Sequence, residues 1–312
     1  SSAASDVYKR QIVIPVYNGA EYILQCLDSL ICQTFQDWEA ICIDDGSLDR
    51  SLEILNEYAE RDSRITVYSQ LNMGVAKARD LGMHYMRGDY FLFIDIDDAL
   101  TPRALQTLYE KIVFEGAPDI VVGGVCVIAG NKIVKMRKTT FSLLDNITYL
   151  KSVLTGKEGW ELWGKAYNRS LLFAPLTYPQ GLRIGEDASA FVQLVSRAKK
   201  IVGCEDVIYN YIQYEGSVSH KKSLELAIET LNAALFIEEY FKGENYYHEI
   251  QAELDTMWLL FYSNSTRRAF LKKSHPLMRL LKDHHFSASA FRLLPLHKAI
   301  YILIIYYFFA KK

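Results

Sequence analysis

The stretch Asp-Tyr-Phe-Leu-Phe-Ile-Asp-Ile-Asp-Asp, residues 89–98, predicts both a central strand and a chemical site. Its continuous apolar and aromatic run, 90–94, is typical of a strand buried on both faces of a parallel sheet. Asp95, Asp97 and Asp98 follow within four residues, and a buried strand cannot hold unpaired carboxylates. We therefore expect these acids just past the carboxyl end of the strand, where open parallel sheets bind ligands.

The three acids have a chemical and a structural interpretation. Carboxylates gathered at one place repel one another unless a cation lies between them. Mg²⁺ and Mn²⁺ prefer oxygen ligands and often join carboxylates to a phosphate, so the predicted cofactor is a divalent metal ion. Alternatively, Asp97 or Asp98 is the N-cap of a helix that begins near Thr101 and Pro102.

Strand and helix patterns alternate four times over the first hundred residues, at intervals of roughly 25 residues, which predicts a parallel, doubly wound sheet. The expected strands are 12–16, 38–43, 65–68 and 90–94. Three of them end in polar residues: Tyr17-Asn18, Asp44-Asp45 and the acids after residue 94. Right-handed crossovers bring such strand ends to one edge of the sheet, so we expect a single site there.

Composition and missing motifs exclude several classes of protein. The first turn, 15–19, reads Pro-Val-Tyr-Asn-Gly, and the chain has neither GxGxxG nor GxxxxGK[ST], which excludes NAD enzymes and P-loop NTPases. A net charge of -2 gives no indication of nucleic-acid binding. The five cysteines lack CxxC or metal-finger spacing, which predicts free thiols in a reducing cytoplasm.

Three segments carry a specific resemblance: IVIPVYNGAEYILQCLDSLICQTFQDWEAICIDDGSLD (12–49), NMGVAKARDLGM (72–83) and GDYFLFIDIDDAL (88–100). Together they resemble the family 2 glycosyltransferases with a GT-A fold, over about residues 12–220. The resemblance implies an α/β, Rossmann-like, mostly parallel sheet sandwiched by helices. It also implies transfer of a sugar from a nucleotide-sugar donor, expected to be UDP-linked, to a saccharide or lipid-linked acceptor.

The resemblance also implies which residues bind the donor. The first turn would lie against the base, a carboxylate of the second strand end would accept the uracil imide proton, and Asp95 would lie near the ribose or diphosphate. Two basic side chains of the 75–86 helix would approach the diphosphate, or would be ordinary surface charges. The implied set is Pro15, Val16, Tyr17, Asp44, Asp45 (the better match), Asn72, Lys77, Arg79 and Asp95. At residue 80, where the family has Asn, this chain has Asp80.

Metal ligands and a catalytic base follow from the same resemblance. Asp97 is the expected direct metal ligand, Asp98 an adjacent ligand or cap, and His220 a residue that completes the metal shell. Asp187 is the expected general base that deprotonates the acceptor hydroxyl, with inversion at the anomeric carbon, and Glu186 orients it or contacts the acceptor. The structural alternative is that Asp187 only caps the following helix.

Later segments are less specific. The aromatic segment 160–167, Trp-Glu-Leu-Trp-Gly-Lys-Ala-Tyr, could stack on sugar rings or could belong to the core. Residues 201–211 resemble a pair of strands. Amphipathic helices are expected after residue 221, with apolar faces at Leu224, Ile228, Leu231 and Leu235 and at Ile250, Leu254, Met257 and Phe261. Residues 1–11 are polar, and we interpret them as an artefactual leader.

The end of the sequence is basic and apolar. From Arg267 to Lys312 there are ten lysines and arginines against one acid, Asp283. The apolar run 299–310 is shorter than the about 20 residues that span a bilayer. It predicts a helix on an anionic membrane surface, or a helix docked in the core. The expected location is the cytoplasm, with peripheral contact to the inner face of the cytoplasmic membrane.

Two other functions compete with an active glycosyltransferase. A sugar-nucleotide nucleotidyltransferase would share the sheet, but it needs a Gly-rich first loop with a basic residue, where this chain has Pro-Val-Tyr-Asn-Gly. The other rival is an inactive nucleotide-sugar-binding or membrane scaffold protein. The acids at 97 and 187 argue against that rival.

Overall fold

The computed structural model describes residues 10–130, 132–179, 181–214, 221–268 and 286–310. The chain divides into two compact units that interleave along the sequence. The first unit holds 1–146, 161–176 and 197–215, and the second holds 147–160, 177–196 and 216–312. The boundary expected at residue 220 therefore does not coincide with the division between the units.

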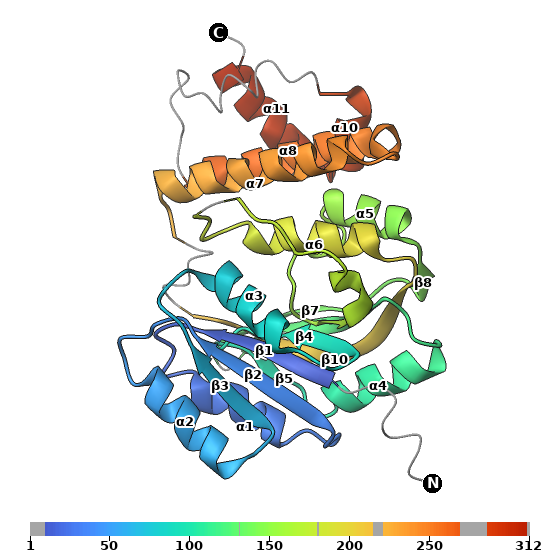
Figure 1. The fold of residues 1–312 in the computed structure, drawn as a ribbon. Helices are drawn as coiled ribbons and strands as arrows, with labels where there is room; N and C mark the ends of the chain where they lie inside the picture. Colours follow the sequence, from blue (N-terminus) through green and yellow to red (C-terminus); the bar gives the residue numbers. More distant parts are fainter. Residues whose placement is uncertain (1–9, 131, 180, 215–220, 269–285, 311–312) are drawn as a thin grey trace. The chain divides into compact units, whose positions relative to one another are not determined.

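The first unit is built on a ten-stranded mixed sheet with the order β3-β2-β1-β4-β9-β6-β10-β5, in which β7 pairs with β6 and β8 with β10 (Figure 1). The strands are β1 (Arg10–Val16), β2 (Trp38–Asp44), β3 (Ile65–Ser69), β4 (Tyr90–Phe93), β5 (Ala99–Leu100), β6 (Ile120–Ala129), β7 (Lys132–Arg137), β8 (Leu143–Leu144), β9 (Lys165–Asn168) and β10 (Ile201–Gln213).

The four predicted strands form the parallel half of this sheet. β1 pairs in parallel with β2 and β4, and β2 pairs in parallel with β3. Every residue of β1 and β4 is buried, as expected from their continuous apolar runs. The doubly wound prediction is confirmed for this half of the sheet.

The start of the first strand needs a correction. Arg10 and Gln11, which we assigned to a leader, are the first residues of β1 and pair with Trp38 and Glu39 of β2. The Arg10 guanidinium is fully buried, 3.7 Å from the centroid of the Phe35 ring. Stacking on an aromatic ring lets a cation occupy a strand position that polarity alone would place outside the fold.

Residues 201–211 also differ from the prediction of two strands. They belong to one long strand, β10, which runs parallel to β6 with register shifts between Gly203 and Val207 and between Val207 and Tyr209. The exposed pair Glu205-Asp206 resembles a turn in the sequence, but a β-bulge accommodates it without ending the strand. β6 and β7 pair antiparallel.

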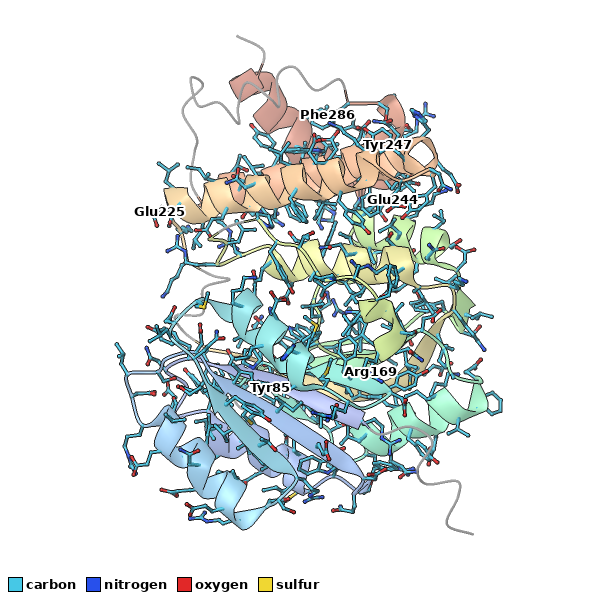
Figure 2. The ribbon with its side chains drawn as sticks, viewed as in Figure 1. Tyr85, Arg169, Glu225, Glu244, Tyr247 and Phe286 are labelled. Carbon is cyan, nitrogen blue, oxygen red and sulfur yellow. The ribbon has the colours of Figure 1, made fainter. Side chains whose placement is uncertain are left out.

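Helices cover both faces of the parallel half (Figure 1). α1 (Ile23–Ile31), α2 (Ser51–Arg61) and α4 (Ala104–Phe114) bury their apolar residues in the main core, with the sheet. α3 (Val75–Tyr85) packs on the other face, where a Cβ on Gly82 would lie 2.4 Å from Val13 Cγ1. Tyr85, labelled in Figure 2, stacks on Tyr68 of β3 with ring centroids 3.7 Å apart. The 3-10 helix η1 (Arg169–Leu172) follows β9.

The second unit is helical. It comprises most of α5 (Asn146–Leu154) and α6 (Glu186–Arg197), then α7 (Leu224–Lys242), the 3-10 helix η3 (Tyr247–Ile250), α8 (Gln251–Arg268), α10 (Ala288–Leu293) and α11 (Leu296–Ala310). Arg183 binds the Glu225 carboxylate at the start of α7 (labelled in Figure 2) at 2.9 Å. None of the helices in the described ranges is both long and apolar enough to cross a bilayer.

The predicted apolar face of η3 and α8 is buried, whereas that of α7 is correct only in part: Leu231 is buried, but Ile228 and Leu235 are only partly so. Ile250, Leu254, Met257 and Phe261 are all buried. On α7, Leu224 is half exposed, and the buried positions include Ala227, Thr230 and Ala234. These small residues lie in the interior, and the Ala227 carbonyl accepts a hydrogen bond from Ser265 of α8 at 2.9 Å. Close helix contact selects small side chains, which a search for large apolar residues overlooks.

Candidate functional site

The turn after β1 is tied to the turn after β2. The backbone N–H of Asn18 donates to Ser47 Oγ at 3.0 Å, and Asn18 Oδ1 accepts from the Leu48 N–H at 2.8 Å. The Asp45 N–H donates to the Val16 carbonyl at 2.8 Å. The first two polar strand ends therefore meet at one edge of the sheet, as the sequence predicted.

The three residues predicted to contact the base differ in exposure. Pro15 and Val16 lie within β1 and are buried. Tyr17 follows the strand, and 48% of it is exposed. Of these three residues, Tyr17 therefore has the ring available to a ligand.

The predicted base-binding carboxylates hold the neighbouring loop. Asp45 is buried and accepts hydrogen bonds from Gln70 Nε2 at 2.7 Å and from the N–H groups of Met73 and Gly74, each at 2.8 Å. Asp44, also buried, accepts from Ser69 Oγ at 3.0 Å. An ionised carboxylate has about four acceptor positions, so one remains at Asp45.

The loop that carries Asn72 passes close to the Asp-Asp-Gly-Ser turn. Gly46 has a φ of +71°, and a Cβ at this position would lie 2.8 Å from the Asn72 backbone nitrogen. Only glycine accepts both the positive φ and this close approach. Asn72 itself is exposed. The base-binding roles of Asp44, Asp45 and Asn72 stay predictions, on a turn that the structure shows to be tightly held.

The acids after β4 form a compact cluster. One carboxylate oxygen from each of Asp95, Asp97 and Asp98 lies within 4.8 Å of the others. Asp98 is almost fully buried and accepts from the Tyr209 hydroxyl at 2.7 Å and from the Ile212 N–H at 2.8 Å. Asp97 and Asp95 are half-buried.

The cluster is not a helix cap. The N-cap residue of α4 is Arg103, and no side chain hydrogen bond caps this helix. The carboxylate of Asp98 instead joins the acidic turn to the far end of β10. The capping alternative for Asp97 and Asp98 is therefore wrong.

Burial and the crowding of negative charge raise the pKa of two of these acids. Burial, followed by repulsion from Asp95, raises the pKa of Asp97 to about 6. Burial, followed by repulsion from Asp95 and Asp97, raises the pKa of Asp98 to about 9, although two hydrogen bonds favour its charged form. A cation at this position would relieve the repulsion, and an oxygen-only donor set is what Mg²⁺ and Mn²⁺ prefer. The residues present therefore fit a hard divalent metal ion.

The two basic residues of α3 have different environments. Arg79 is buried, and its Nη2 donates to Asp95 Oδ1 at 2.9 Å, so it is not a solvated surface charge. Lys77 is exposed and pairs at 3.0 Å with Asp80, the residue that departs from the family pattern. Arg79 thus fixes the first acid of the cluster, whereas Lys77 carries a surface pair.

The predicted catalytic acids lie in the second unit. Glu186 and Asp187 are the first two residues of α6, so Asp187 lies inside the first helical turn. Their roles stay predictions. His220, the predicted third member of the metal shell, lies outside the described residues.

Tyr209 is the site residue that sequence reasoning missed. Its fully buried hydroxyl donates to Asp98 and accepts from the Asp95 N–H at 3.2 Å. Burial, followed by the charges of Asp98 and Asp95, raises the pKa of Tyr209 well above its ordinary value. Tyr209 and Tyr211 are two residues apart, so on a strand their side chains point to the same face of the sheet. This spacing was the only indication in the sequence that the two tyrosines act together.

A GT-A sheet whose acidic strand ends gather beside the first turn defines the class of nucleotide-sugar-dependent glycosyltransferases. The chain matches glycosyl transferase family 2 over residues 11–178. It is 30% identical over 278 residues to the cholesterol galactosyltransferase of Borreliella burgdorferi, a match that covers 82% of this chain and 74% of that protein. The chain belongs to family 2.

Two further comparisons extend this result. Glycosyltransferase GlyA of Streptococcus pneumoniae is 32% identical over 222 residues, which is 68% of this chain but only 31% of GlyA. This chain thus spans about a third of that relative. The structure of S. aureus TarS 1–349 in complex with UDP-GlcNAc superposes with a TM-score of 0.67 at 19% identity, covering 93% of this chain and 82% of TarS 1–349. That likeness confirms the GT-A fold.

Proposed function

We propose that this chain is an inverting, metal-dependent glycosyltransferase that moves a sugar from a UDP-linked donor to a saccharide or lipid-linked acceptor. The observation that carries the proposal is the cluster of Asp95, Asp97 and Asp98 at the sheet edge of a family 2 chain. A UDP-sugar donor is supported by TarS, a protein of the same fold that was solved with UDP-GlcNAc.

The donor would lie along the joined turns of β1 and β2. The exposed ring of Tyr17 offers a stacking surface for the base. Three hydrogen-bond donors hold the Asp45 carboxylate in place. Its remaining acceptor position would receive the imide N–H of the uracil base. Asn72 and Lys77, both exposed, are available to the ribose and diphosphate.

Asp97 and Asp98 would hold the metal ion, with Asp95 beside them. A bound divalent ion supplies charge stabilisation for the departing nucleoside diphosphate. Asp97 suits this role because its carboxylate accepts no hydrogen bond from another described residue. Arg79 and Tyr209 keep the other two carboxylates in place, so the cluster is organised before a ligand arrives.

Asp187 would act as the general base. It lies in the first turn of α6, where the helix dipole favours a negative charge. It takes the proton of the acceptor hydroxyl as that oxygen attacks the anomeric carbon from the face opposite the leaving nucleotide. Glu186, beside it, orients Asp187 or contacts the acceptor.

The deciding test is calorimetric titration with UDP in the presence of Mn²⁺. Asp97→Asn should abolish metal-dependent binding, whereas Asp89→Asn, at the other end of β4, should leave it unchanged. Unchanged UDP affinity in Asp97→Asn would place the metal elsewhere. A protein that binds nucleotide but neither hydrolyses nor transfers from any common UDP- or GDP-sugar would be an inactive binding protein, and the enzyme proposal would fail.

The catalytic roles need a separate measurement. Asp187→Asn should keep the UDP affinity of the wild type and lose transfer to acceptor, because it removes only the base. Near-normal turnover would make Asp187 a structural residue. The anomeric configuration of the product, measured by NMR, tests inversion directly.

We further propose that the basic C-terminal region contacts an anionic membrane surface, where lipid-linked acceptors are found. The support is its charge, ten basic residues against one acid, and the exposed apolar residues of α11.

A further inference from the structure

A cavity of about 320 Å³ lies over one face of the β10–β6–β7 part of the sheet. Two rows of cross-strand neighbours form its floor: Val125 lies opposite Arg137, and Val127 lies between Tyr211 and Lys135. Glu161 and Trp163, from the segment before β9, complete the lining. All these residues belong to the first unit, so its own strands define the cavity.

One wall of the cavity is aromatic and rigid. The Trp163 ring stacks nearly parallel to the rings of Tyr209 and Tyr211, with centroid distances of 4.6 and 5.3 Å and interplanar angles of 7° and 11°. The next residue, Gly164, has a φ of +70°, and a Cβ there would meet the Val125 side chain at 3.4 Å. Stacking on two rings holds the tryptophan in this wall.

The opposite wall is charged. Arg137 forms an ion pair with the Glu161 carboxylate. Burial opposes the charge on Glu161, but the neighbouring Lys165 and Arg137 cations hold the pKa of this acid below its usual range. The ammonium of Lys165 donates to the Glu161 carbonyl at 2.6 Å, which fixes the segment that carries both walls. The exposed side chain of Lys135 lies at the rim.

The aromatic wall is continuous with the acid cluster. Tyr209, against which Trp163 stacks, donates its hydroxyl to Asp98. Tyr211 lines the cavity two residues further along the same strand. The cavity and the cluster therefore share β10 as a common support, with one aromatic layer between them.

We propose that this cavity binds a sugar ring of the acceptor. Flat aromatic faces beside a guanidinium–carboxylate pair suit a ring with an apolar face and a hydroxyl-bearing edge, and the volume is at the small end of the about 300–1,000 Å³ typical of small-molecule sites. Trp163 and Tyr211 contact the ring, and Arg137 and Glu161 bind its hydroxyls. This inference rests on the proposed glycosyltransferase function.

The test measures saccharide binding and nucleotide binding separately on the full chain. Methyl α- and β-glycosides of glucose, galactose and N-acetylglucosamine are titrated by saturation-transfer NMR with UDP and Mn²⁺ present. Val127→Phe fills the cavity and should weaken glycoside binding at least about tenfold, with unchanged UDP affinity. The matched control, Ile133→Phe, adds the same ring at an exposed position of β7 outside the cavity and should bind as the wild type does.

Glu161→Gln is the second variant, because Val127→Phe could fail to fold. It keeps the size of the side chain and should also weaken glycoside binding without changing UDP affinity. Wild-type protein that binds none of the glycosides, or variants that bind them normally, would overturn the inference. If the wild-type protein does not bind UDP, the proposed function is refuted instead. The glycoside titration would still show whether the cavity binds a sugar.

Discussion

At the scale of single residues, Asp97 makes the cluster sensitive to pH. Its pKa in the fold, about 6, lies above the ordinary 3.8, so its contribution to stability is fully present below pH 3.8 and is lost as pH rises through about 6. A metal ion needs the ionised form. We therefore expect Mn²⁺ to raise the melting temperature strongly above pH 6 and only weakly well below it.

Thermal unfolding with and without Mn²⁺, at several pH values, measures this effect. Asp97→Asn should show little Mn²⁺ stabilisation at any pH and should be more stable than the wild type in metal-free buffer above pH 6, because it removes a repelled charge. An Mn²⁺ effect of equal size on both sides of pH 6 would show that Asp97 does not bind the ion.

Arg79 offers a second test at this scale. Its side chain is 3% exposed and its partner Asp95 is 29% exposed, so Arg79→Met leaves a carboxylate without its cation. We expect a loss of roughly 3 kcal/mol in the free energy of unfolding, measured with urea. The matched control is Lys77→Met two positions earlier, where an exposed pair is worth at most about 1 kcal/mol. Equal losses would mean that the Arg79–Asp95 pair has no special role.

The residues of the site divide into those that the sequence predicts and those that it does not. Asp95, Asp97 and Asp98 could be placed at the sheet edge because alternating strands and helices fix where parallel strands end. Tyr209 could not, because its contact with Asp98 spans 111 residues and depends on the register of β10. A pattern within a short window contains no information on such a pairing.

At the scale of elements, the packing of α3 on β1 depends on one glycine. Alanine in a helix interior is favoured over glycine by about 1 kcal/mol, yet a Cβ at Gly82 would lie 2.4 Å from Val13 Cγ1. We expect the clash to dominate, so that Gly82→Ala destabilises the fold by about 1–3 kcal/mol in urea unfolding.

A double-mutant cycle separates the clash from other effects. Val13→Ala alone leaves a cavity and should also destabilise the protein, but in the double variant the new methyl group fills part of that space. The double variant should be clearly more stable than the sum of the single losses predicts. Simple additivity would show that the loss in Gly82→Ala does not arise from contact with Val13.

The elements that were misread share a cause. β10 contains a bulge whose exposed acids resemble a turn, and α7 buries alanines and a threonine as well as large side chains such as Leu226 and Leu231. In both cases tertiary pairing decides the outcome: β6 supports β10 on either side of the bulge, and α8 contacts α7 through its small residues. Local patterns predicted that a strand and a helix exist there but not their extent or inward face.

At the scale of the whole molecule, the division into compact units is the feature least accessible from the sequence. Residues 147–160 and 177–196 belong with the helices after residue 216, although they lie within the segment that resembles the catalytic domain. The predicted base, Asp187, is thus carried by a different unit from the predicted metal ligands. A boundary drawn from a change in composition cannot show such interleaving.

The basic residues of the chain are concentrated in its C-terminal region, which includes the helix α11. This helix buries Ala299 and Ile302 in a small core, whereas Leu296, Ile300 and Leu303, spaced four and three residues apart, are 77%, 49% and 48% exposed. Its described residues thus combine a docked face with an apolar exposed one. We expect this exposed stripe, together with the basic residues of the sequence from Arg267 onward, to bind anionic vesicles.

Co-sedimentation with phosphatidylglycerol vesicles measures that binding. Deletion after Arg292 should release the protein, and the triple change Leu296→Ser, Ile300→Ser and Leu303→Ser should weaken partitioning at least about tenfold while leaving the docked face intact. The matched control replaces three other exposed leucines, Leu24, Leu48 and Leu71, with serine and should leave the partitioning unchanged. Because surface charges are screened, binding should fall as salt rises. Equal partitioning of the wild type, the triple variant and the deletion would exclude a membrane role for this helix.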